Sequence, residues 1–223
     1  WRPYAIAFAA TIAAITVSSY LPHLRLWGLG TWAYLGTWTP LAAGIVSLAV
    51  VVLILRSRIG DQKINSSPAQ FAIFTAAAMV ATGVVFALFS TETHFLGDGY
   101  SVLHLLAADS PLIKGREIGE SMAHVWVKQL TGVTGDDGAL WSFRIISITA
   151  GVLFTGATVL FARRRFDDCA LRLVLIGGLL TGGYMLLFFG YVENYSLFVL
   201  AVGLFVLTGM AAAQGMIARW WIL

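Results

Sequence analysis

Long apolar stretches separated by short polar ones dominate the pattern of this chain. Six of them are long enough to cross about 30 Å of hydrocarbon, which takes roughly 20 helical residues. Each must be a helix, because a lone strand in lipid leaves its backbone groups without hydrogen bonds. We expect spans at residues 5–21, 36–55, 71–89, 145–162, 171–190 and 195–213. The pattern therefore predicts an all-α fold, a polytopic bundle of about six transmembrane helices.

One long polar segment, residues 91–138, interrupts the apolar pattern. Within it we expect a short helix at residues 101–108, which ends before a Ser-Pro pair. A second helix is expected at residues 117–130, with the pattern of an amphipathic helix in the membrane interface. Its more apolar stripe is Ile118, Met122, Val125 and Gln129, and its polar positions are Glu117, Glu120, His124 and Lys128.

Composition supports a membrane class. Hydrophobic residues make up 59% of the chain and charged residues only 11%, against about 25% charged in a soluble domain. The sequence has no basic stripe with interleaved aromatic residues, which is the pattern that would indicate nucleic-acid binding. The single cysteine, Cys169, excludes an internal disulfide and a multi-cysteine metal site. Because the chain starts at Trp1 and ends on an apolar run, we expect it to be a portion of a longer protein.

The distribution of basic residues predicts the orientation in the membrane, since Lys and Arg accumulate on the cytoplasmic side. With the N-terminus inside, nine basic residues fall inside and five fall outside. The inner set is Arg2, Arg56, Arg58, Lys63, Arg163, Arg164, Arg165, Arg172 and Arg219. We therefore expect an integral protein of a bacterial inner (plasma) membrane, with a cytoplasmic N-terminus and residues 91–138 outside.

The same orientation puts a second, smaller polar segment outside, at residues 191–195. We expect an N-terminal transmembrane helix pair at residues 1–66 and a larger membrane module at residues 67–223. The larger module would contain both polar segments. Their residues are the candidates for chemistry, provided that the two segments meet.

Two carboxylates stand out in these segments. Asp98 lies between two glycines, and an Asp at a membrane surface fits a general base or a metal ligand. The alternative is a turn or helix N-cap, which Asp favours by itself. Glu193 lies in a very short turn between apolar helices, where a carboxylate usually has a bonding partner or a function. The alternative is that it is simply hydrated at the surface.

Several neighbouring residues are candidates for substrate binding. Lys114 and Arg116 lie between the two loop helices and could bind a phosphate or pyrophosphate. Contact with anionic lipid headgroups is the alternative. Tyr100, Tyr191 and Asn194 add hydrogen-bonding groups beside the two carboxylates. The histidines of the long segment have spacings that do not form a metal motif.

This arrangement resembles the membrane-embedded GT-C glycosyltransferases, which include mannosyltransferases and aminoarabinose transferases that use polyprenyl-phosphate sugars. In that class the first outer loop carries an acidic residue, and the matching stretch here is Phe95-Leu96-Gly97-Asp98-Gly99-Tyr100. The stretch Phe189-Gly190-Tyr191-Val192-Glu193-Asn194-Tyr195-Ser196-Leu197 resembles a later outer-loop region of the same site. The family often pairs two acidic residues, whereas Asp98 is followed by Gly99. A divalent metal held by the loop is therefore possible but not required.

The resemblance implies an enzyme that moves a sugar from a polyprenyl-phosphate donor to an acceptor on the outer face. Asp98 and Glu193 would be its catalytic residues, and the lipid bilayer and the lipid-linked sugar its partners. The alternative function is a non-catalytic structural subunit of a larger membrane complex. In that case small residues such as Gly177, Gly178, Gly182 and Gly183 would pack against partner helices.

Overall fold

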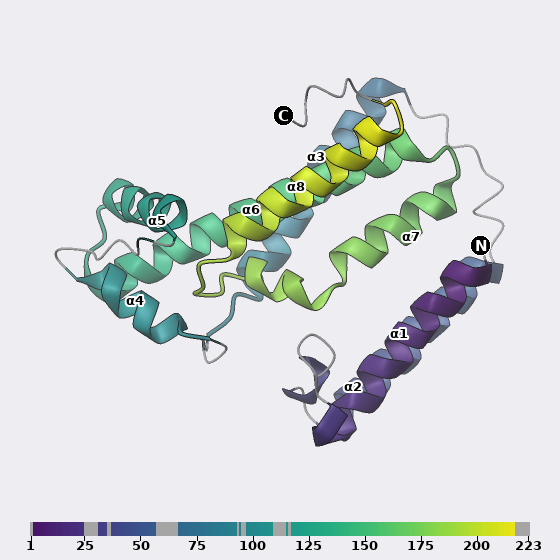
Figure 1. Ribbon diagram of the computed structural model, residues 1–223, viewed down its shortest axis with the longest axis horizontal. Helices are drawn as coiled ribbons and strands as arrows, with labels where there is room; N and C mark the ends of the chain where they lie inside the picture. The colour runs from purple at the N-terminus through teal and green to yellow at the C-terminus, as the bar shows by residue number, and fades with distance from the viewer. Residues whose placement is uncertain are drawn as a thin grey trace. The chain divides into compact units, whose positions relative to one another are not determined.

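In the computed structural model of the chain, every regular element among the described residues is a helix. The structure describes residues 2–24, 31–34, 37–56, 67–92, 94, 97–108, 115 and 117–216. Within these ranges, three helices are long and apolar enough to cross a membrane, namely α3 (Pro68–Leu88), α6 (Gly135–Arg165) and α8 (Ser196–Ala213) (Figure 1). The predicted all-α class is therefore confirmed, with the helices expected of a membrane protein.

The chain divides into two compact units, of which the first contains Trp1–Asn65 and Phe166–Gly183 and the second contains Ser66–Arg165 and Tyr184–Leu223. In the first unit, α1 (Arg2–Tyr20) packs against α2 (Thr39–Arg56). Two short 3-10 helices, η1 (Pro22–Leu24) and η2 (Thr31–Tyr34), lie between them in the sequence.

The span predicted at residues 171–190 is not one continuous helix. Helix α7 (Cys169–Leu180) ends at Thr181, and the 3-10 helix η4 (Gly183–Phe188) follows. The hydroxyl of Thr181 donates to the carbonyl oxygen of Gly177 at 2.6 Å, and a glycine pair comes directly after it. Glycine costs about 1 kcal/mol relative to alanine inside a helix, so Gly182 and Gly183 favour an end of the helix within the apolar run.

In the second unit, the start of α3 follows from its local sequence. The side chain of Ser67 accepts a hydrogen bond from the backbone of Gln70 at 3.2 Å. The side chain of Gln70 accepts one from the backbone of Ser67 at 3.0 Å. This capping box, with Pro68 at the first helical position, fixes the entry into the span.

Helix α6 is the central element of the second unit. It packs against α3, α8 and two shorter helices, α4 (Gly99–Ala107) and α5 (Ile118–Thr131) (Figure 1). Its contacts depend on small residues. A Cβ at Gly151 would come within 2.5 Å of Phe188, and a Cβ at Gly203 of α8 would come within 2.4 Å of Phe154. Small residues at these places allow the close helix packing that is typical within membranes.

Helix α5 turns its polar side toward the protein. Glu120 is 9% exposed and His124 is 2% exposed, whereas Trp126 and Leu130 are 59% and 85% exposed. Lys128 also points inward, where its ammonium group donates to three carbonyl oxygens at the end of α4, at 2.7, 3.0 and 3.3 Å. The helix exists where the sequence predicted it, and its polar stripe makes the internal contacts.

Candidate functional site

The two polar segments meet in the second unit. The backbone N–H of Thr91 donates to the carbonyl oxygen of Phe189 at 2.8 Å. The backbone N–H of Val192 donates to Nδ1 of His94 at 3.2 Å. The rings of His94 and Tyr191 are in edge contact, with centroids 5.3 Å apart. Residues nearly a hundred positions apart therefore form one site, and we refer to its two parts as the 97–99 turn and the 189–195 turn.

The 97–99 turn lies directly against the carboxylate of Glu193. A Cβ at Gly97 would be 2.6 Å from Oε2 of Glu193, and Gly97 has a φ of +84°. A Cβ at Gly99 would be 2.6 Å from the carbonyl oxygen of Val192. Only glycine combines a positive φ with the absence of a side chain. The glycines on both sides of Asp98 therefore allow this close approach.

Asp98 occupies the N-cap position of α4, but its side chain makes no capping hydrogen bond to that helix. The residue is exposed, whereas Glu193 is only 6% exposed. The two carboxylates thus occupy environments of different polarity within one site. Asp98 is therefore accessible from outside the fold, whereas Glu193 is enclosed by it.

The other predicted site residues have different positions. Tyr191 is 3% exposed and Asn194 is 6% exposed. The amide nitrogen of Asn194 donates to Oε2 of Glu117 at 2.5 Å. Tyr100 is 39% exposed, with its ring centroid 6.0 Å from that of His94. Two further predicted residues, Lys114 and Arg116, lie outside the described residues.

His94 is held neutral at this site. Burial lowers its pKa, and the positive charge of Arg144 lowers it further. Its Nδ1 accepts the hydrogen bond from Val192, so the ring proton resides on Nε2. His94 therefore joins the two turns as a neutral hydrogen-bonding group.

Arg144 is a further functional candidate, which the sequence places near the outer end of α6. It projects from α6 toward the 189–195 turn, since a Cβ at Gly190 would be 3.0 Å from its Cγ. Its Nε is buried and has no hydrogen-bond partner among the described residues. The salt bridges found within the described ranges do not include it either. A partly buried guanidinium without an anion is costly, which makes it a natural place for an anionic ligand.

Two glutamates at the start of α5 form hydrogen bonds with the 189–195 turn and with the start of α8. Glu117 binds Asn194, as described above, and Oε1 of Glu120 accepts a hydrogen bond from the backbone N–H of Leu197 at 3.2 Å. Burial raises the pKa of Glu120 to about 7, against the opposing effect of the N–H groups at the start of α8. The signal in the sequence was the polar stripe of Glu117, Glu120, His124 and Lys128, which repeats with a helical period.

We expect Glu120 to make the stability of the folded chain fall as pH rises. Its pKa is about 7 in the fold, against about 4.3 in an unfolded chain. Between these values the fold keeps a proton that the unfolded chain has lost, so raising the pH through this window is destabilising. Thermal unfolding in detergent should show a melting temperature that decreases from pH 5 to pH 8.

The matched variants are Glu120→Gln and Glu92→Gln. The first keeps an acceptor oxygen for Leu197 but cannot titrate, so it should flatten this part of the pH profile. The second changes an exposed glutamate and should keep the profile of the parent. An unchanged slope in Glu120→Gln would contradict the assignment.

Within the described ranges, no group of three or more His, Cys, Asp or Glu side chains is arranged to hold a metal ion. The described part of the site therefore does not fit a metal held by protein ligands alone. Comparison with protein-family models, curated proteins and solved structures finds no match to this chain.

Proposed function

We propose that this chain belongs to a membrane glycosyltransferase that moves a sugar from a polyprenyl-phosphate donor to an acceptor hydroxyl. The observation that carries the proposal is the contact of the 97–99 turn with the carboxylate of Glu193. It unites the two segments whose sequence resembles the GT-C site. The site combines an exposed acid, a buried acid and a guanidinium that has no ion pair among the described residues, which suits a phosphorylated substrate.

The proposed reaction uses these groups in one displacement. The carboxylate of Asp98 takes the proton of the acceptor hydroxyl, whose oxygen forms a bond to the anomeric carbon of the sugar. The bond from that carbon to the phosphate oxygen breaks, and its electron pair leaves with the polyprenyl phosphate. A positioned base and donor together supply several powers of ten in rate. Inversion at the anomeric carbon follows from this single displacement.

Glu193 and Arg144 support this step from the second turn and from α6. Glu193 places a second carboxylate beside the turn that carries Asp98. Arg144 provides a guanidinium for the phosphate, whose negative charge grows as the sugar leaves. Lys114 and Arg116 are the further cations of the loop. No step is assigned to a metal ion, because the described residues do not form a ligand set.

The topology that we propose has six spans. Three are α3, α6 and α8, and three further spans would use the apolar parts of α1, α2 and the α7–η4 stretch. The N-terminus would be cytoplasmic, and the site would face the outer side. The last turn of α6 carries Arg163, Arg164 and Arg165, which supports a cytoplasmic end for that helix.

Cysteine labelling tests this topology. In a background without Cys169, a cysteine at exposed Gln129 should react with a membrane-impermeant maleimide added to the outer side. A cysteine at exposed Arg164 is the matched control and should react only after the membrane is opened. Reaction of Gln129→Cys from the cytoplasmic side alone would exclude an outer site.

Sugar transfer is the direct test of the function. The full-length protein in nanodiscs is incubated with a panel of radiolabelled polyprenyl-phosphate sugars and membrane acceptors. Transfer that depends on Asp98 supports the enzyme. Absence of transfer from every donor, together with the purification of a stable partner chain on this unit, would favour the second candidate.

That second candidate is a structural subunit of a larger membrane complex. The observation that favours it is on α7, where a Cβ at Gly177 or Gly178 would meet no atom of the described residues within 4 Å. Such open glycines allow a partner helix to come close. We place it second, because it gives no role to the acids gathered around the 97–99 turn.

A further inference from the structure

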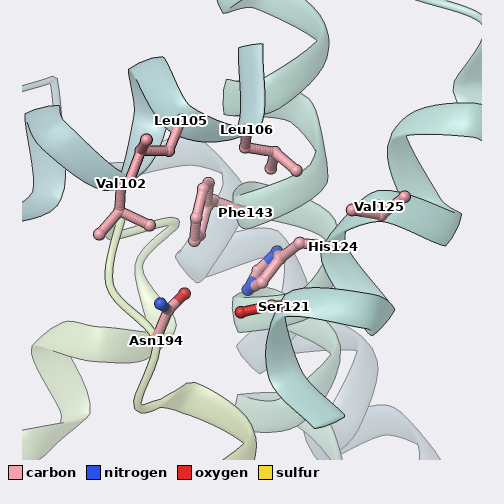
Figure 2. A pocket seen from close by; sticks show the side chains of 8 residues that line it. All are labelled: Val102, Leu105, Leu106, Ser121, His124, Val125, Phe143 and Asn194. Atoms are coloured by element: carbon pink, nitrogen blue, oxygen red, sulfur yellow. The ribbon is translucent and has the colours of Figure 1, made fainter. Parts of the chain in front are cut away.

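A small cavity lies beside the site, next to Asn194 (Figure 2). Its volume is about 20 Å³, whereas a single water molecule needs about 10–15 Å³. Most of its wall is apolar, and the apolar side chains are Val102, Leu105, Leu106, Val125 and Phe143. Three polar side chains complete it, namely Ser121, His124 and Asn194. The cavity therefore has room for one small polar group, and only a few of its lining side chains can form a hydrogen bond with that group.

His124 provides a buried hydrogen-bond acceptor at this cavity. The hydroxyl of Ser142 donates to the carbonyl oxygen of His124 at 2.7 Å. The oxygen of Ser142 can therefore only accept from Nδ1 of His124, which is 3.3 Å away. This arrangement puts the ring proton on Nδ1 and leaves a lone pair on Nε2. Burial also lowers the pKa of His124 to about 4, so the ring is neutral near pH 7.

The Nε2 atom of His124 has no hydrogen-bond partner among the described residues, although the side chain is only 2% exposed. A buried acceptor in this state is costly unless a donor reaches it. Figure 2 shows the ring at the cavity, with Ser121 and Asn194 beside it. One N–H of Asn194 donates to Glu117, and its amide oxygen is a second acceptor. Ser121 can donate or accept.

Two acceptors and a hydroxyl, without any charge, favour a neutral donor over an anion. We propose that the cavity is a hydroxyl-binding site, in which an O–H group donates to Nε2 of His124. In the substrate-free protein the hydroxyl comes from one bound water molecule. During turnover the hydroxyl is one of the sugar's own. This second source of the hydroxyl rests on the proposed function. The site is separate from Arg144, so phosphate and hydroxyl recognition use different groups.

Histidine NMR tests whether a bound water molecule donates to Nε2 of His124 in the substrate-free protein. The chain contains four histidines, and ¹⁵N-histidine labelling in nanodiscs reports the state of each ring nitrogen. We expect Nε2 of His124 to be unprotonated and hydrogen-bonded, with a cross-peak from the ring to a long-lived water molecule. The signal is assigned by its loss in His124→Phe. The exposed His104 is the internal control and should show only rapidly exchanging water.

A proton on Nε2, a shift typical of a nitrogen without a hydrogen bond, or the absence of bound water would overturn the proposal. A second variant, Ser142→Ala, removes the group that fixes the tautomer. It should produce a mixture of both ring tautomers, whereas a merely structural histidine would not change. This measurement needs no enzymatic activity, so its failure is separate from a failure of the proposed function.

The second source is tested with two lipids. A polyprenyl-phosphate sugar should remove the water cross-peak, and the same polyprenyl phosphate without sugar should leave it in place. Retention of the cross-peak with both lipids would overturn the sugar as a source and leave the water site intact.

Discussion

Replacing Asp98 by asparagine is expected to abolish sugar transfer while the protein still folds and binds its donor. The side chain keeps its shape but can no longer take a proton, and general-base catalysis contributes about 10²–10⁴-fold in rate. Since the carboxylate makes no capping hydrogen bond to α4, the helix should not depend on it. The measurement is transfer from a polyprenyl-phosphate sugar, together with donor binding and the melting temperature.

Glu193→Gln is the matched variant for this experiment. It changes the buried carboxylate next to Gly97 and should slow transfer less, because Glu193 supports the proton transfer and does not perform it. Full activity in Asp98→Asn would remove Asp98 from the mechanism. An equal loss in the two variants, with unchanged folding, would show that the two acids act as a unit.

The apolar helices were predictable because lipid leaves the backbone almost no alternative to a helix. The approximate positions of α3 and α8 follow from the length of their apolar runs alone, whereas α6 begins at Gly135, ten residues before the predicted span and within the segment predicted as polar. The break after α7 was not predictable in the same way. The pattern at residues 171–190 is apolar throughout, and the helix ends before Gly182 and Gly183, although an earlier pair, Gly177 and Gly178, remains helical.

The meeting of the two turns could be anticipated, but its geometry could not. Sequence indicated that Asp98 and Glu193 occur in separate polar segments that belong to one module. The structure adds His94, whose Nδ1 binds the backbone of Val192, and the contact at Gly97. His94 belongs to no recognisable sequence motif, so the sequence alone does not indicate its contacts. Those contacts depend on which segment folds against it.

Helix α5 illustrates the same limit. Its amphipathic pattern was evident, but a pattern alone does not decide which side faces the protein. In a soluble domain the apolar side would be buried. Here Glu120 and His124 are buried and Trp126 is exposed. The backbone N–H of Leu197 in α8 donates to Glu120, and His124 bonds with Ser142 of α6.

Removing the charge of Arg144 is expected to weaken donor binding by roughly 10- to 100-fold. Charge-assisted hydrogen bonds contribute about 1.5–3 kcal/mol, which corresponds to this range. Arg144→Met is the suitable variant, because it keeps an apolar stem beside Gly190. The measurement is the KM for the polyprenyl-phosphate sugar, with kcat determined separately.

The role of Arg144 in binding can be separated from a structural role by two further measurements. Arg144→Lys keeps the charge but loses the planar donor fork, so its KM should lie between those of the parent and Arg144→Met. The melting temperature of Arg144→Met should not fall, because the guanidinium has no ion pair within the described ranges. A lower melting temperature with an unchanged KM would assign Arg144 to the fold. The phosphate would then have to be bound by Lys114 and Arg116 alone, and Arg116→Ala would carry the full loss of donor binding.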